Sequence, residues 1–154
     1  MTGPNPTDRG KQGVKRSVRT DGRGAPLGLA VAGANRNDHL LLEETLDGSP
    51  DGGPQPPDDL DLGLWLDKGY DYDAVHGSVR QHGYVPHIVP RDAERLLLKI
   101  PGYRARRWPV ERTHSWMNRF RRILVRWEKK VANYTGLLHL VCAFICFKLA
   151  GLVR

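Results

Sequence analysis

The sequence predicts an α/β fold, a mixed sheet flanked by helices, and three observations carry this prediction. Two segments near the N-terminus are joined by an Asp-Gly turn, which is typical of an antiparallel hairpin. Farther along, short apolar runs alternate with helical patterns, which indicates parallel strands packed against helices. The C-terminal third combines a basic amphipathic segment with an apolar one, and both have the spacing of long helices.

Length, charge and cysteine content limit the classes of function that the chain can have. The 154 residues make one domain, and 24 basic against 17 acidic residues give a net charge of +7. A pI near 9.7 indicates a polyanionic partner. Cys142 and Cys146 lie one helical turn apart in an apolar run, which is neither a disulfide framework nor a zinc pattern. With a polar start that is unlike a signal peptide, they predict a cytoplasmic protein with buried, reduced thiols.

The first elements are a lead and a hairpin. We expect residues 1–12 to be mobile, followed by strands over 13–21 and 25–35 with Asp21-Gly22 at the corner. Small residues in the second strand, Gly28 among them, indicate that another element packs closely on one side. The first strand carries cationic side chains that predict one wet face: Lys15, Arg16 and Arg19.

A short helix over 39–47 is expected after the hairpin. Asn37 or Asp38 can cap its start, and it should end near the following glycine. Residues 48–59 contain four prolines and have an acidic bias. We interpret them as a surface loop within one domain, because neither flank has enough apolar residues to fold alone.

The next elements alternate strand and helix. Residues 62–66 are a short apolar run that ends abruptly at Asp67, which is typical of a buried parallel strand. A helix is expected over 72–83 and an edge strand, limited by its prolines, over 84–90. Residues 91–103 are expected to be a partly helical connection.

The positive charge lies in one block, residues 104–130. It contains ten basic residues against two acidic ones, whereas the rest of the chain has 14 against 15. At about 100° per residue, its apolar residues share one face of a single predicted helix; they are Trp116, Phe120, Ile123, Leu124, Trp127 and Val131. A neighbouring face is basic and consists of Arg112, Arg119, Arg122, Arg126 and Lys129.

Two interpretations of the basic face are open. A charged helix face is most often simply solvated. Here arginine outnumbers lysine, and the acids that would pair at i+4 on a merely soluble helix are nearly absent. Arginine suits bidentate phosphate contact, so we favour nucleic-acid binding.

The apolar segment 131–153 has two interpretations as well. Its length approaches that of a membrane span, but Asn133, His139 and Lys148 interrupt it. We therefore predict a helix packed on the sheet and no membrane insertion.

Asp67 and Glu111 are the candidate catalytic residues. A carboxylate among arginines usually makes a salt bridge, and spacing alone is a weak signal. A carboxylate at a strand end beside another on a facing helix is also a way in which proteins hold Mg²⁺. Two such ions can activate an attacking oxygen and stabilise a departing one in phosphodiester cleavage.

Two blocks of sequence carry a family resemblance. Asp-Lys-Gly-Tyr-Asp at 67–71 and Trp-x-Val-Glu-Arg-x-x-x-Trp-x-x-Arg-Phe-Arg-Arg at 108–122 resemble the second half of the DDE transposases of bacterial insertion sequences. Residues 3–47 resemble the hairpin and first helix of the same RNase H-like catalytic domain, so the likeness covers essentially the whole chain. It implies Mg²⁺- or Mn²⁺-dependent DNA cleavage and strand transfer at terminal repeats, in the cytoplasm at the nucleoid.

The resemblance also assigns residues. It implies that Asp67 and Glu111 are the second and third metal-binding acids, and that Arg107 contacts DNA. The family's later lysine position falls near Asn118, so that part does not carry over. The first acid lies on a strand upstream of Met1 in this family; Asp8 lies in the lead and Asp21 in the hairpin corner, so neither occupies the end of a central strand. The resemblance therefore predicts a single partial, truncated RNase H-like domain over 1–154.

Three hypotheses follow. The chain is a transposase fragment, inactive alone, for which an upstream-encoded polypeptide supplies the missing strand; or it is a non-catalytic remnant that grips DNA through its arginines. The third is a basic helical module for a protein or membrane surface, which we do not favour. The inner edge left by a missing strand would invite pairing with a partner, and an oligomer is possible.

Overall fold

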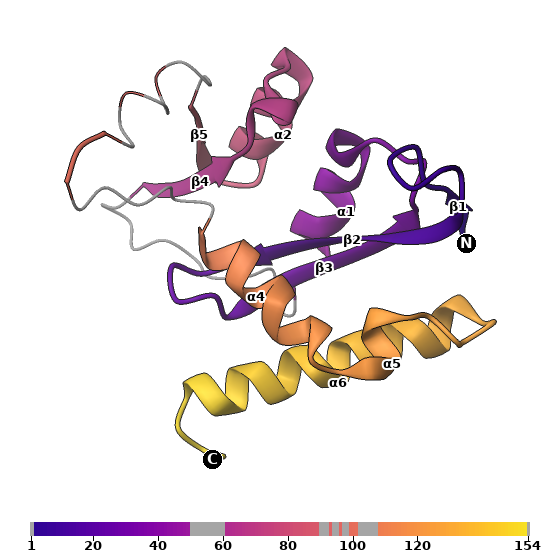
Figure 1. Ribbon diagram of the computed structural model, residues 1–154. Coiled ribbons are helices and arrows are strands. Elements are labelled where there is room, and N and C mark those ends of the chain that lie inside the picture. The colour runs from indigo at the N-terminus through magenta and orange to yellow at the C-terminus, as the bar shows by residue number, and fades with distance from the viewer. Residues whose placement is uncertain are drawn as a thin grey trace.

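The computed structural model describes residues 2–49, 61–89, 99–101 and 108–153, with positions 93 and 96. Three antiparallel strands lie in the order β1-β2-β3, with bounds Gly3–Pro4, Gln12–Thr20 and Pro26–Gly33. A separate pair, β4 (Leu62–Leu66) and β5 (Tyr84–Ile88), is parallel. The mixed α/β class with long C-terminal helices is confirmed, and Figure 1 shows helices on both faces of the hairpin.

The predicted hairpin is present with its turn at Asp21. The Asp21 carboxylate accepts hydrogen bonds from the backbone N–H groups of Arg23 (2.9 Å) and Ala25 (2.7 Å). Gly24 has a φ of +85°, which favours glycine at that place in the turn. The expected mobile lead is wrong in part, because β1 pairs with the start of β2.

A short helical segment covers one face of the hairpin. The 3-10 helix η1 (Asp38–Leu41) runs into α1 (Leu42–Asp47), which ends at Gly48. A Cβ atom at Gly28 would lie 2.2 Å from the Thr45 carbonyl oxygen, so the predicted close packing on the second strand is confirmed. The predicted side-chain cap is wrong: Asn37 makes no such bond, and Asp38 pairs with Lys15 at 3.1 Å.

The wet face predicted for the first strand is also wrong. Val14 and Val18 of β2 pack against the apolar cluster beneath the hairpin. On the other face the Ser17 hydroxyl accepts a hydrogen bond from Thr45 of α1 at 2.7 Å. Arg19 is 7% exposed. Because helices cover both faces, the cationic side chains of β2 lie against protein.

The parallel pair has one covered face. Leu64 and Leu66 of β4 pack with Val75 and Val79 of α2 (Asp73–Gln81), whereas Trp65 is 43% exposed. The strands were therefore predicted correctly, but β4 is not buried on both faces. The predicted loop 48–59 and connection 91–103 fall largely outside the described residues.

The single helix predicted across the basic block is wrong. The chain forms α4 (Trp108–Asn118), α5 (Arg121–Leu124) and α6 (Val131–Leu149). Phe120 leaves the helical region at φ −86° and ψ 106°, and its ring packs edge-on against Phe144 of α6. The turn lets α5 fold back onto α6, which buries Met117 and Ile123 together.

Helix α6 packs against β3 on one face. Tyr134, Leu138, Val141 and Ile145 are buried there with residues of the hairpin, whereas Leu140 is 67% exposed. By length and composition alone, α6 is the one described helix that could cross a membrane. Its contacts with the sheet agree with the predicted packed helix.

Candidate active site

Asp67 and Glu111 line the same cavity, which has a volume of about 1060 Å³. Its walls come from β2, α1, β4 and the first turns of α4. Both carboxylates are exposed to solvent. Two acids that are 44 residues apart in the sequence therefore line one cavity.

Strand β4 sets the direction of Asp67. Its even-numbered residues Leu64 and Leu66 pack under α2, so the odd-numbered residues point to the opposite face. Asp67 follows the strand directly with an extended backbone and accepts the N–H of Lys68 at 2.8 Å. The hydrogen bond at the start of the turn after β4 therefore holds the Asp67 carboxylate at the end of the strand.

Helix α4 sets the position of Glu111. Thr113 is fully buried, and its hydroxyl lies 2.6 Å from the carbonyl of Gly24 in the hairpin turn. Arg112 lies over the rings of Trp108 (4.2 Å) and Trp116 (5.0 Å) and donates to the carbonyl of Arg23. These contacts anchor α4 to the turn, and Glu111 lies in its first turn, where a negative charge is favourable.

The pKa of Tyr70 is affected by the negative charge around Asp67. Burial, followed by the nearby carboxylates of Asp38 and Asp67, raises the pKa of Tyr70 to about 12, against a hydrogen bond with Ser17 that lowers it. The phenol therefore stays protonated at neutral pH. Tyr70 therefore links the turn after β4 to η1 and to β2.

Part of the cavity wall is basic. Arg16 donates to the Asn118 side chain at 2.7 Å, and Arg19 donates to Tyr84 and Ser49. His114 lies one turn after Glu111, and burial and then the charge of Arg16 lower its pKa. At neutral pH its imidazole is therefore uncharged.

Two further acids on the cavity wall have identified partners. Asp21 caps the hairpin turn, and Asp38 pairs with Lys15 at 3.1 Å. In the part of the chain that the structure describes, no group of three acidic, histidine or cysteine side chains could hold a metal ion. Two predicted acids lie at the cavity, but the described residues alone do not complete a metal site.

The predicted DNA-binding residues divide into two groups. Arg112 is half-buried against its tryptophans, and Arg126 lies 5.4 Å over the Tyr134 ring and donates to the Glu128 carbonyl. Arg112 anchors α4 to the hairpin turn, and Arg126 contacts α6, which corrects the expected continuous outward row. Arg119, Arg122 and Lys129 are exposed. Arg107 lies outside the described residues.

Comparison with known proteins identifies the family. The model of the transposase DDE domain matches residues 2–146. The chain belongs to this family of DDE transposases. It is similar to a Burkholderia cepacia protein named as a candidate transposase for insertion sequence element IS402, with 36% identity over 148 residues. The match covers 95% of this chain and 68% of that protein. No solved structure matches the chain.

Sequence reasoning missed several side chains at this transposase cavity. Arg19, Tyr70 and His114 line it, yet none was singled out as a site residue. Arg19 was assigned to a wet face from the polarity of its strand alone. Tyr70 lies within the Asp-Lys-Gly-Tyr-Asp block, so its place three residues after Asp67 was the available signal.

Proposed function

We propose that the chain is a transposase fragment that takes part in Mg²⁺-dependent DNA cleavage and strand transfer, with Asp67 and Glu111 as metal ligands. The observation that carries the proposal is the meeting of both carboxylates at one cavity. Each offers the hard oxygen ligands that Mg²⁺ prefers, and Mn²⁺ would be accepted as well. The bound metal would activate the attacking oxygen and stabilise the departing one.

Among the described residues, no third acid completes the site with Asp67 and Glu111. Asp21 and Asp38 also line the cavity but serve the turn and an ion pair, and Asp8 pairs with Lys11 at 3.4 Å in the N-terminal loop. A site with two acids of three loses ligands to both metals, so the chain alone is expected to cleave little or no DNA. An upstream-encoded polypeptide would supply the strand and its aspartate.

Other residues of the cavity would contact the DNA. The uncharged His114 and the Arg16 beside it would face the DNA phosphates from the wall next to Glu111. The exposed cations of the α4–α5 segment would hold the DNA backbone. The substrate would be the terminal repeats of a mobile element, in the cytoplasm at the nucleoid, and the active form could be an oligomer.

The test is complementation. Fusing the upstream coding sequence should restore Mg²⁺-dependent nicking of terminal-repeat DNA, and either Asp67→Asn or Glu111→Gln should abolish it. Asp8→Asn is a matched control, because its ion pair is exposed and contributes little to stability. A fused protein that still nicks DNA after Asp67→Asn would show that the assignment is wrong.

A second candidate function is DNA binding without cleavage. It is favoured by the exposed cations around α5, which remain available whether or not the metal site is complete: Arg119, Arg121, Arg122, Lys129 and Lys130. It predicts weak sequence preference and steep salt dependence. A complemented protein that binds DNA in this way but never nicks it would favour this function over the first.

A further inference from the structure

The connection between α5 and α6, residues 125–130, carries an exposed tryptophan. Trp127 is 74% exposed, the largest exposed fraction among the described large apolar side chains. Leu124 and Val125, which come just before it, are exposed as well. Large apolar side chains that gather on a surface often mark a binding site, whereas a single exposed one needs no explanation. This group of three, which we call the Trp127 surface, therefore calls for a ligand.

The connection is held in place by Arg126. The Nε of Arg126 donates to the Glu128 carbonyl at 2.9 Å, and one terminal nitrogen donates to the Lys129 carbonyl at 3.2 Å. The same guanidinium lies 5.4 Å over the ring of Tyr134, which is buried against the hairpin. A loop that is already ordered loses less conformational entropy when it binds. Trp127 is therefore carried by a preorganised loop.

The surroundings of Trp127 are positive because the acid beside it is turned inward. Residues 119–130 contain six basic residues and one acidic residue, Glu128. The Glu128 side chain is 7% exposed and pairs with Arg122 at 2.9 Å. The other exposed cations here form no ion pair within the part of the chain that the structure describes; they are Arg119, Arg121, Lys129 and Lys130. Charge complementarity therefore favours a polyanion as the partner of the Trp127 surface.

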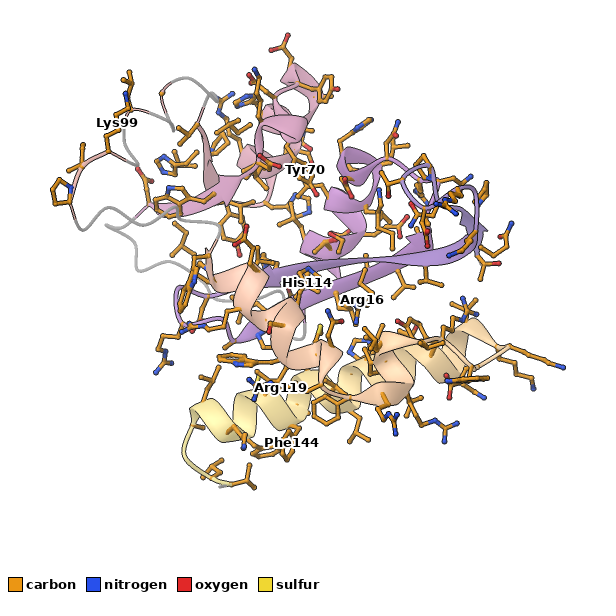
Figure 2. All side chains as sticks on the ribbon, in the orientation of Figure 1. Arg16, Tyr70, Lys99, His114, Arg119 and Phe144 are labelled. Atoms are coloured by element: carbon orange, nitrogen blue, oxygen red, sulfur yellow. The ribbon has the colours of Figure 1, made fainter. Side chains whose placement is uncertain are left out.

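The Trp127 surface lies apart from the cavity. The first turns of α4 line the cavity, and the 11 residues of α4 span about 16 Å before the turn into α5. Figure 2 shows the labelled Arg119 at that turn, well away from Tyr70, which lines the cavity. Figure 1 shows the connection after α5 at the edge of the molecule. At 3.4 Å per base pair, 16 Å corresponds to about five base pairs, so one DNA molecule can reach both places.

We propose that Trp127 stacks on an unpaired base of bound DNA, while the cations around it hold the flanking phosphates. DNA as the polyanion rests on the proposed function. In an intact duplex the faces of the bases are covered by their neighbours, so an indole ring has no face to stack on. An unpaired base offers its face, and stacking of this kind tolerates any base. The site therefore distinguishes DNA with an unpaired base from a fully paired duplex.

The test compares two labelled duplexes of the same arbitrary sequence, one fully paired and one with a single bulged thymine. The full chain, without added metal ion, should bind the bulged duplex about tenfold more tightly. Trp127→Ala should remove this preference. Trp127→Phe should keep most of it, because phenylalanine also stacks on bases.

Two controls separate stacking from charge and from general loss of apolar surface. Stacking releases no counterions, so Trp127→Ala should leave the slope of log affinity against log salt unchanged. Leu140→Ala removes a similarly exposed apolar side chain, 67% exposed on α6, and should change neither affinity. The melting temperature of each variant shows whether it folds, and the comparison of the two duplexes uses the unaltered chain in any case.

Equal affinity of the unaltered chain for the two duplexes would overturn the proposal, and so would a preference that survives Trp127→Ala. Vesicles of phosphatidylserine and phosphatidylcholine test an anionic lipid surface instead. Binding to them that Trp127→Ala removes, with no effect on DNA binding, would assign the surface to lipid.

The stacking site and the catalytic assignment fail separately. A complemented protein that prefers the bulged duplex through Trp127 but never nicks DNA would leave the stacking site standing and refute the metal assignment. A complemented protein that nicks DNA but shows no such preference would refute the stacking site alone.

Discussion

Removing the exposed cations of the α4–α5 segment should lower the salt dependence of DNA binding by a calculable amount. Arg119 and Arg121 are exposed and have no acidic partner in the part of the chain that the structure describes, and Arg122 is 73% exposed beside Glu128. Each phosphate contact contributes about 0.9 to the slope of log affinity against log salt. The triple change to glutamine should therefore reduce the slope by about 2.7. Between 50 and 200 mM salt, this difference amounts to roughly 40-fold in affinity.

The assay is fluorescence polarisation of a labelled duplex over that range of salt. A control triple with the same change in net charge, Lys11, Arg36 and Arg80 to glutamine, should leave the slope nearly unchanged. Arg126→Gln should lower stability without a comparable change in slope, because Arg126 is occupied by Tyr134 and the Glu128 carbonyl. An unchanged slope for the first triple, or an equal change for the control, would refute the reasoning.

Three further outcomes concern the scaffold. Gly28→Ala should lower the free energy of unfolding by about 1–3 kcal/mol in urea titrations, because its Cβ would meet the α1 backbone at 2.2 Å; Gly22→Ala, with nothing within 4 Å, is the matched control. Thr113→Val should cost about 1–3 kcal/mol by leaving a turn carbonyl unpaired, and the exposed Ser115→Ala should cost little. A backbone carbonyl, followed by a carboxylate, raises the pKa of His82 above 6.5. The protonated His82 therefore stabilises the fold fully below pH 6.5, and this stabilisation declines as the pH rises through the pKa of His82 in the folded protein. His82→Gln should remove this decline when thermal unfolding is measured across pH. A variant whose melting temperature depends on pH as in the unaltered chain would contradict the prediction.

Much of the fold could be predicted because its signals are local. The Asp-Gly corner, the apolar run before Asp67 and the glycine after α2 are each decided by neighbouring residues. The small residue at position 28 even indicated where α1 would approach. Such signals depend on turn chemistry and on the period of two along a strand, both of which the sequence displays directly.

The wrong predictions concern places where packing against residues distant in sequence determines the local structure. Helical periodicity continues without interruption from Trp116 to Val131, so nothing local marks the turn at Phe120. That turn exists because Phe120 packs on Phe144 and lets α5 fold onto α6. The charge of Arg19 likewise predicted solvent, whereas its true surroundings, Ser49 and Tyr84, come from remote parts of the chain.

The candidate site shows the same division. The sequence indicated Asp67 and Glu111 through their blocks, but their meeting depends on how the hairpin turn holds α4. Thr113 bonds the Gly24 carbonyl, and the stacked Arg112 bonds the Arg23 carbonyl, so a turn remote in sequence anchors the helix that carries Glu111.

This anchoring gives the arginine-rich block two separate tasks. Arg112 and Arg126, stacked on aromatic rings, hold α4, α5 and α6 in place. Arg119 is exposed, whereas the exposed Arg122 pairs with the Glu128 carboxylate at 2.9 Å. Neutralising the first pair should therefore disturb Glu111 and stability together, whereas neutralising Arg119 should lower DNA affinity without a loss of stability. All four arginines fall on one face of the helix that the sequence predicts. Only their contacts in the structure therefore distinguish the two roles.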